Sequence, residues 1–326
     1  MLEFLKLSLP KLNYQHKLFF IGSCFSDNMA EKLRQDKIEV INNPFGVMFH
    51  PDALVKVLER AMNESMYEER DFFEWDGYWF CFEHHSKLAE RNLRVYLNKA
   101  NALLMETKKQ LQHTDTLFIT LGSAWGYEKE GEVVANCHQQ NGVLFDENLL
   151  EVNESAKRMR ALLKKIRVQN SDLNIVFTVS PVRHYKDGML ENQQSKSLLN
   201  TLCHALCDES SNSYYFPSYE YVIDYLRDYK YFKSDKVHPN ELAISKLYEF
   251  FVIHFFDEYS REVISKWQSL NLSLQHKSLR RYSPSNLKFK ESLKKQLEMF
   301  ESQYHVSCGN EIENISSEIE QIRQGI

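Results

Sequence analysis

The fold is decided by residues 17–26, which read KLFFIGSCFS. An apolar run of strand-forming residues leads directly into a glycine, and a helical pattern follows at residues 27–35, with Ser26 the expected N-cap. A short buried strand that turns sharply into a helix is typical of a parallel α/β sheet. The turn lies at the carboxyl end of its strand, where open α/β sheets bind their ligands.

Three further apolar runs predict strands of the same sheet, at residues 116–121, 175–179 and 214–216. Helical patterns alternate with these runs, at residues 91–112, 147–168, 195–207 and 240–256. This alternation predicts an α/β fold with a doubly wound parallel sheet and helices on both faces.

Two insertions interrupt the alternation. Residues 72–80 place Asp76-Gly77 between two aromatic segments, which is a strong hairpin signal. Residues 125–136 predict a second hairpin that turns near Glu130-Gly131.

The composition changes after about Tyr259, so we predict an α/β domain over residues 1–258 and a helical extension over residues 259–326. Within the extension, residues 280–286 have the composition of a linker, and amphipathic helices are expected at residues 288–304 and 311–326. Such helices usually pack on their own domain, and a homodimer contact through them is the alternative.

The composition argues against several classes of protein. A net charge of −5 argues against binding nucleic acid, which needs a concentrated basic face. No apolar run approaches the ~20 residues of a membrane helix, and the N-terminus lacks a signal peptide's pattern, so we expect a cytoplasmic protein without membrane contact. The six cysteines are scattered and form no Cys-x-x-Cys pair, which favours free thiols over disulfides or a zinc ribbon.

Cys24 follows the strand-to-helix turn, where the helix dipole favours negative charge and thiols lose protons more easily. It is therefore a candidate nucleophile. The alternative is that Cys24 is a small buried apolar residue and Ser23 a turn-former. The spacing alone does not decide between the two.

Residues 22–26 resemble the signature of the GSCFA family, which is similar in fold to the SGNH (GDSL-type) hydrolases and acyl esterases. Further segments carry the same resemblance: NPFG at residues 43–46, TLGSAW at 120–125, NCH at 136–138, SPVRH at 180–184 and DKVHP at 235–239. The resemblance spans roughly residues 15–255 and implies a flavodoxin-like sheet of the SGNH type.

SGNH enzymes usually carry Gly-Asp-Ser, with the serine as nucleophile. Without a gap, Gly22 matches the glycine, Ser23 the aspartate and Cys24 the serine. A slip of one residue makes Ser23 the nucleophile instead. The ungapped register also aligns Phe25 and the start of the helix, and we therefore favour Cys24.

Asp235 and His238 lie three residues apart before a helix, with Pro239 expected at its first position. A carboxylate at this spacing can fix the imidazole tautomer and leave the other nitrogen free as a base. The resemblance implies that Asp235 orients His238 and that His238 activates the nucleophile. The alternative is that this segment only caps the helix.

An acyl-transfer site also needs hydrogen-bond donors for the developing oxyanion. The Cys24 N–H is one candidate. The resemblance adds a glycine block, matched by Asn43 to Gly46, and an asparagine block that this chain replaces with Gly122-Ser123; Ser123 or Asn136 is expected to substitute. After the third strand, His184 follows Arg183, which is suited to an anionic or sugar group of a substrate or to an ordinary surface ion pair.

We therefore expect an ester hydrolase or acyltransferase that needs no cofactor or metal and acts on a small-molecule or carbohydrate ester. The alternative is a non-catalytic ligand- or carbohydrate-binding module on the same scaffold. A third hypothesis is a metal-dependent hydrolase that uses His138, His184 and His238. Cys203 and Cys207 share a helix face while His204 points away, which argues against a structural zinc there.

Overall fold

The computed structural model describes residues 7–184, 188–208 and 212–324. The N-terminal residues 1–6 and the last two residues of the helix expected at 311–326 lie outside the described residues. The chain forms two compact units. The first ends at Phe255, and the second contains residues 256–326 together with the short segments 12–14 and 35–37.

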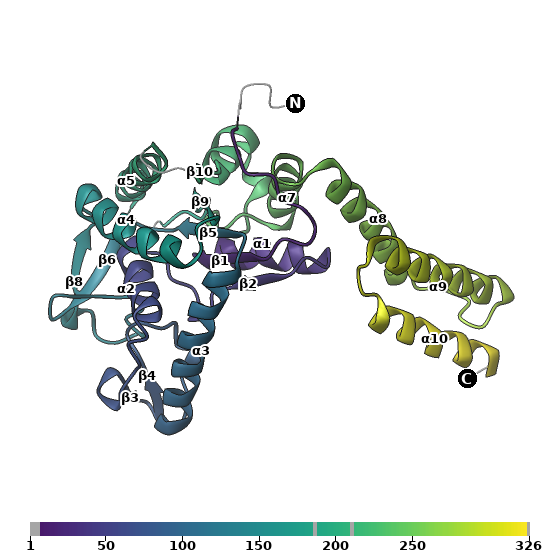
Figure 1. The fold of residues 1–326 in the computed structure, drawn as a ribbon, viewed down its shortest axis with the longest axis horizontal. Coiled ribbons are helices and arrows are strands. Elements are labelled where there is room, and N and C mark those ends of the chain that lie inside the picture. Colours follow the sequence, from purple (N-terminus) through teal and green to yellow (C-terminus); the bar gives the residue numbers. More distant parts are fainter. Residues whose placement is uncertain (1–6, 185–187, 209–211, 325–326) are drawn as a thin grey trace. The chain divides into compact units, whose positions relative to one another are not determined.

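The first unit is built on a parallel five-stranded sheet, which confirms the predicted α/β class. Its strands are β1 (Leu18–Gly22), β2 (Val40–Asn42), β5 (Thr116–Leu121), β9 (Asn174–Val179) and β10 (Ser213–Tyr215). Their spatial order is β2-β1-β5-β9-β10 (Figure 1). This is the flavodoxin-like arrangement, in which ligands bind beyond the carboxyl ends of the two strands where the order reverses, here β1 and β5.

Alternate strand residues enter two different cores, as a doubly wound sheet requires. Phe19, Ile21 and Ile119 are fully buried in the core that the helices of one face complete. Those helices are α2 (Pro51–Met62), α3 (Leu93–His113), α4 (Val152–Gln169) and α5 (Met189–Asp208). On the other face, Phe20 stacks on Phe118 at 4.3 Å between ring centroids, and both rings contact Phe251.

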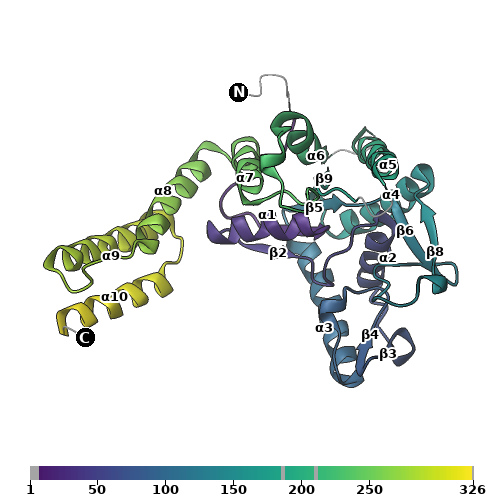
Figure 2. The ribbon, with the colours of Figure 1, turned by 180° about the vertical axis from the view of Figure 1, so that it is seen from behind.

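Phe251 belongs to α7 (Glu241–Phe255), which covers this second face together with α1 (Cys24–Gln35) (Figures 1 and 2). Three shorter helical segments precede α7 in the chain: α6 (Ser218–Glu220), a π-helical turn (Tyr221–Leu226) and a 3₁₀ turn (Tyr229–Tyr231).

Two predictions of secondary structure were incomplete. Neither β2 nor α2 was predicted. Strand β2 has only three residues, which is too few to form a pattern. Helix α2 begins at Pro51, and a proline at the first position of a helix is a start signal that the prediction did not use. The helix expected at residues 147–168 is wrong at its start, because residues 146–149 form strand β8 (Asp146–Leu149), which pairs with β6 (Trp125–Lys129). Tertiary pairing overrides the local helical pattern there.

Both predicted hairpins are confirmed. Strands β3 (Phe73–Trp75) and β4 (Tyr78–Phe80) pair around Asp76 and Gly77, whose φ angles are +49° and +75°. Strand β6 pairs with β7 (Glu132–Val134) around Glu130 and Gly131, at +55° and +78°. Two successive left-handed residues are what a type I′ turn needs.

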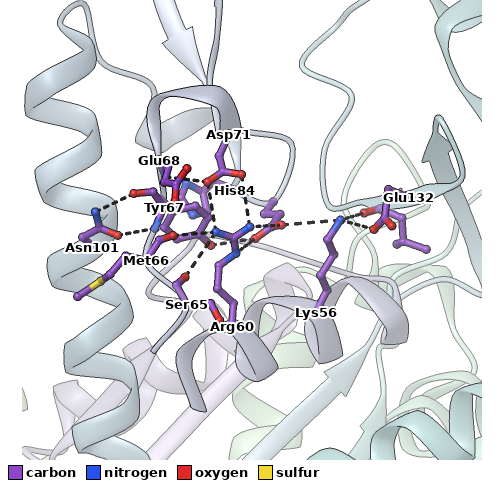
Figure 3. A network of polar contacts seen from close by, with 12 residues as sticks. Lys56, Arg60, Ser65, Met66, Tyr67, Glu68, Asp71, His84, Asn101 and Glu132 are labelled. Atoms are coloured by element: carbon purple, nitrogen blue, oxygen red, sulfur yellow. Dashed lines mark hydrogen bonds and ion pairs between the residues drawn. The ribbon is translucent and has the colours of Figure 1, made fainter. Parts of the chain in front are cut away.

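A network of ion pairs fixes the segment around the first hairpin to α2 (Figure 3). Arg60 of α2 lies 3.3 Å from the Asp71 carboxylate and 3.0 Å from that of Glu83, and it is 19% exposed. Lys56, one helical turn earlier, pairs with Glu83 and with Glu132 of β7, at 3.7 and 3.0 Å. The network thereby ties both hairpin regions to one helix.

The second unit is helical, with α8 (Glu258–Gln275), α9 (Pro284–Tyr304) and α10 (Gly309–Gln324). Their apolar sides pack on one another through Trp267, Leu297, Phe300 and Ile315. The expected linker is wrong in its second half, because Ser283 caps α9 and the helix begins at Pro284. Among the described residues, no helix is long and apolar enough to cross a membrane.

Candidate active site

The turn after β1 requires a glycine. Gly22 has a φ angle of +129°, and a Cβ at this position would lie 2.0 Å from the Thr120 carbonyl oxygen of β5. This close approach allows the Ser23 N–H to donate to the same oxygen at 3.0 Å. The turn is therefore held against the neighbouring strand, and it presents Ser23 and Cys24 at the carboxyl edge of the sheet.

Ser23 is buried, and its Oγ accepts a hydrogen bond from the Phe25 N–H at 3.3 Å. It therefore caps α1, which begins at Cys24. The expectation that Ser26 is the N-cap is wrong, because the helix starts earlier and the Ser26 hydroxyl donates to the Thr120 hydroxyl at 2.8 Å.

Cys24 is half-buried at the first position of α1. Burial raises the pKa of its thiol above the ordinary value, and the Asp27 carboxylate raises it further. Three effects lower the pKa: a hydrogen bond from the N–H of Cys24 itself and the charges of Lys196 and Lys233. They are too small to offset the rise. The expectation of an easily ionised thiol is therefore wrong, because desolvation outweighs the favourable position at the helix N-terminus.

Asp235 and His238 form the pair that their spacing predicts. His238 Nδ1 lies 2.8 Å from Asp235 Oδ2, while Asp235 Oδ1 accepts from the Val237 and His238 N–H groups at 2.8 and 3.0 Å. These backbone hydrogen bonds and the imidazole lower the pKa of Asp235 to about 2. A carboxylate can only accept, so the His238 proton lies on Nδ1 and Nε2 carries a lone pair.

Pro239 does not begin the following helix. The helix α7 starts at Glu241, and Asn240 caps it, since its Oδ1 accepts from the Ala243 N–H at 3.1 Å. Pro239 instead pairs with Phe232 in an isolated β-bridge. His238 therefore lies in a loop before the cap and is not itself part of the cap.

The loop that holds His238 packs on the segment that follows β9. The Arg183 N–H donates to the Val237 carbonyl at 3.2 Å, and the Arg183 guanidinium lies over the rings of Phe232 and Tyr229, at 4.7 and 5.9 Å. The next residue, His184, has its pKa lowered to about 4, first by burial and then by Lys196 and His238.

Lys196 of α5 is fully buried, and sequence reasoning missed it. Its ammonium donates to the Gly122 carbonyl at 2.6 Å and to the Ser180 carbonyl at 2.9 Å, which joins the ends of β5 and β9. One signal could have revealed it: Lys196 precedes Leu199 by three residues and Cys203 by seven, so it lies on their buried stripe.

A family model supports the resemblance seen in the sequence: the model of the GSCFA family matches residues 17–251. The chain belongs to the GSCFA family. A search of curated proteins finds no match. The matched region of this GSCFA protein contains the turn at residues 22–24, Lys196 and the Asp235–His238 pair.

Several N–H groups that were expected to be oxyanion donors instead donate hydrogen bonds to backbone carbonyls within the GSCFA domain. The Gly46 N–H donates to the Asn43 carbonyl at 2.8 Å, and the Gly122 and Ser123 N–H groups share the Phe49 carbonyl at 2.8 and 3.2 Å. Their role as oxyanion donors stays a prediction. The Cys24 N–H differs from them, because the first N–H groups of a helix have no acceptor within it.

The two expected asparagines hold loops in place. Asn43 accepts from the Gly22 N–H at 2.8 Å and donates to the Asp27 carboxylate at 2.7 Å. It thereby connects the end of β1 with the first turn of α1. Asn136 accepts from the His138 N–H at 2.7 Å, and its Oδ1 lies 3.3 Å from the Ser86 hydroxyl oxygen.

His138 belongs to a network of its own. Its Nε2 lies 2.8 Å from the Cys81 carbonyl and its Nδ1 lies 2.8 Å from the Ser86 hydroxyl, so Nε2 carries the proton. Burial lowers the pKa of His138 to about 4, which makes it a weak base. The metal hypothesis fails on geometry: within residues 7–184, 188–208 and 212–324 no three His, Cys, Asp or Glu side chains could hold a metal ion together.

Proposed function

We propose that this GSCFA protein is an ester hydrolase or acyltransferase of the SGNH type. The observation that carries the proposal is the Asp235–His238 pair, whose geometry leaves Nε2 of His238 as a base. The pair follows the nucleophile turn in the chain order Ser/Cys, Asp, His, which is the order of the SGNH enzymes. Both segments adjoin the carboxyl ends of the parallel strands, where this topology binds ligands.

We favour Cys24 over Ser23 as the nucleophile. The Ser23 hydroxyl is buried and accepts a hydrogen bond as a helix cap, whereas Cys24 is half-buried and has no capping role. The raised pKa of Cys24 means that its thiol is neutral near pH 7, so a base must remove the proton as the sulfur attacks. The lone pair on Nε2 of His238 meets this need.

In the proposed reaction, Cys24 Sγ attacks the carbonyl carbon of the ester and its proton moves to His238 Nε2. The protonated His238, held by Asp235, then gives this proton to the departing alcohol, which leaves a thioester on Cys24. Water or a second alcohol resolves the thioester with His238 again acting as the base. The Cys24 N–H is the proposed donor to the oxyanion.

The substrate proposed is an acylated carbohydrate or another small ester, and the compartment proposed is the cytoplasm. All six cysteines are free, in agreement with a reducing compartment. No nucleic acid or membrane partner is proposed. A homodimer through the C-terminal helices is the weaker proposal, because those helices bury their apolar residues on one another.

Paired labelling tests the proposal. The protein is treated with iodoacetamide or with a fluorophosphonate, the modified residue is mapped by mass spectrometry, and turnover of p-nitrophenyl acetate is measured. We expect iodoacetamide to modify Cys24 at a rate that falls in His238→Ala, and turnover to be lost in Cys24→Ala and His238→Ala. Cys137→Ala, which removes another half-buried thiol, is the control and retains turnover. Full turnover in both Cys24→Ala and His238→Ala would rule out the proposed catalytic mechanism.

A non-catalytic carbohydrate-binding module is the second candidate. This candidate is favoured by the N–H groups of Gly46, Gly122 and Ser123. They donate hydrogen bonds to backbone carbonyls of the loops, and not to the oxyanion of a substrate. A cavity of about 350 Å³ beside the first hairpin, lined by Trp75 and Tyr78 among others, offers a place to bind. Titration calorimetry with acetylated oligosaccharides separates the candidates: binding without turnover, weakened by Trp75→Ala, supports the module.

A further inference from the structure

The buried face of α9 changes character along the helix. Its buried positions follow helical spacing, and toward the C-terminal end they carry large apolar or aromatic side chains: Leu293, Leu297, Phe300 and Tyr304. The two buried positions nearest the start of the helix are polar instead. They are Asn286 and Lys290, each 7% exposed. Because polar groups are costly to bury, these two residues call for a reason beyond packing.

A cavity of about 420 Å³ lies at this polar end of α9. Asn286 and Lys290 line it from α9, Glu318 lines it from α10, and Lys277 and Arg281 line it from the loop between α8 and α9. All of these residues belong to the helical second unit. Sites for small molecules usually have volumes of about 300–1,000 Å³, so the cavity has room for a small ligand.

The charges that line the cavity do not cancel. Lys290 Nζ lies 2.7 Å from the Glu318 carboxylate, so these two side chains neutralise each other. Within the part of the chain that the structure describes, neither Lys277 nor Arg281 forms an ion pair with a carboxylate. Three cations and one carboxylate therefore leave the lining with an excess of two positive charges.

Arg281 is held in place from two sides. The buried Asn286 side chain donates from Nδ2 to the Arg281 carbonyl oxygen at 2.6 Å, and the Arg281 guanidinium donates to Gln321 Oε1 of α10 at 2.6 Å. The bond to Gln321 uses one of the five N–H donors of the guanidinium. A guanidinium can bind a phosphate through two parallel hydrogen bonds, so this arginine is positioned before any ligand arrives.

We propose that this cavity binds a phosphate monoester, with Arg281 and Lys277 as the partners of its phosphate oxygens. A phosphate monoester carries about −1.5 to −2 charges at pH 7 and offers three acceptor oxygens, which matches an excess of two positive charges. A carboxylate offers only one negative charge. The site lies in the helical unit, so it goes beyond the proposed ester chemistry and does not depend on Cys24 or His238.

Titration calorimetry on the full chain is the first test, with inorganic phosphate and ribose 5-phosphate as ligands and ribose as the uncharged counterpart, all at one ionic strength in chloride. We expect saturable binding of the two phosphates and none of ribose. Arg281→Met and Lys277→Met should each weaken the binding by about tenfold or more, because each removes hydrogen bonds to a charged group. Both side chains are exposed, and circular dichroism checks that the variants are folded.

Arg280→Met is the matched control. Arg280 is exposed in the same loop, but it does not line the cavity, so its loss should leave the affinity unchanged. An equal loss of affinity in Arg280→Met and Arg281→Met would reduce the effect to the general charge of the loop and overturn the proposal. Unchanged affinity in a folded Arg281→Met, or binding of ribose as tight as that of ribose 5-phosphate, would overturn it too.

The second test separates the two sources of such a phosphate, a soluble small molecule and a lipid head group. The chain is sedimented with vesicles of phosphatidylcholine, with and without phosphatidic acid, whose head group is a phosphate monoester. Saturable calorimetric binding without sedimentation supports the site with a soluble ligand. Sedimentation that requires phosphatidic acid and is lost in Arg281→Met supports the site with a lipid ligand. A wild-type chain that binds in neither experiment would refute the proposal, and ester turnover plays no part in either.

Discussion

The Asp235 carboxylate lies 2.8 Å from Nδ1 of His238, while its other oxygen accepts two backbone N–H groups of the same loop. The aspartate therefore fixes the loop and the imidazole together. An asparagine keeps an oxygen acceptor for the backbone but loses the charge and can present an N–H to Nδ1, which favours the wrong tautomer of His238.

Asp235→Asn is expected to reduce ester turnover on the order of 10³- to 10⁴-fold while the protein stays folded. The measurement is kcat/KM for p-nitrophenyl acetate, with circular dichroism as the folding check. Asp228→Asn is a matched control, because Asp228 is an exposed loop aspartate with similar backbone hydrogen bonding. Equal activities of the two variants would remove Asp235 from the mechanism.

The loop should also respond to acid in a defined range. The folded pKa of Asp235 is about 2, below the ordinary 3.8, so its contribution to stability is present above about pH 4 and is lost as the pH falls through 2. A ¹³Cγ titration by NMR measures this directly. A midpoint at or above 3.8 would show that the hydrogen bonds to this carboxylate do not persist in solution.

The buried histidines make the fold sensitive to mild acid. His138 has a folded pKa of about 4 and His84 of about 3, both below the unfolded value of 6.5. The unfolded chain therefore binds more protons below pH 6.5, and stability falls as the pH drops from 6.5 through 4. We expect each histidine to contribute a slope of about 1.4 kcal/mol per pH unit in this range.

Urea unfolding between pH 7 and 4.5 measures that slope. His138→Asn should make it shallower by one histidine's share, whereas His113→Asn, at an exposed helix end, should leave it unchanged. Equal slopes for the wild type and His138→Asn would show that His138 is not kept neutral by the fold.

Gly22→Ala is expected to destabilise the protein by more than about 2 kcal/mol, because the new Cβ would meet the Thr120 carbonyl oxygen at 2.0 Å in a backbone conformation that favours glycine. Gly142→Ala adds a Cβ to open space and should be nearly neutral. Thermal unfolding of the two variants gives the comparison. Similar midpoints would mean that the turn relaxes without cost.

Arg60→Leu is expected to lower the free energy of unfolding by about 2–3 kcal/mol, since it leaves the carboxylates of Asp71 and Glu83 without their main cation. Arg70→Leu removes an ion pair whose partners are 80% and 61% exposed and should cost less than about 1 kcal/mol. Urea unfolding distinguishes them. A cost below 1 kcal/mol for Arg60→Leu would show that the network in Figure 3 is not needed for stability.

The sheet was largely predictable from the sequence, because β1, β5 and β9 are continuous apolar runs that only a doubly covered parallel sheet accommodates. The edge strand β2 was not, since Val40 to Asn42 is too short to form a pattern. The Asp235–His238 contact followed from spacing because it is local. The protonation of Cys24 was not predictable, since it depends on desolvation by segments distant in sequence. The burial of Lys196 was signalled only by its helical spacing to the buried Leu199 and Cys203.

The hydroxyl of Ser26 and that of Thr120 bond across 94 residues of chain. A nascent chain that has been synthesised only as far as α3 already contains residues 22–26, but it lacks β5, the strand that holds them in their native conformation. Grafting these five residues onto a loop of another protein would likewise transfer the sequence of the motif without its backbone conformation. In this molecule the motif acquires its chemistry from its neighbours, and only after β5 has been synthesised.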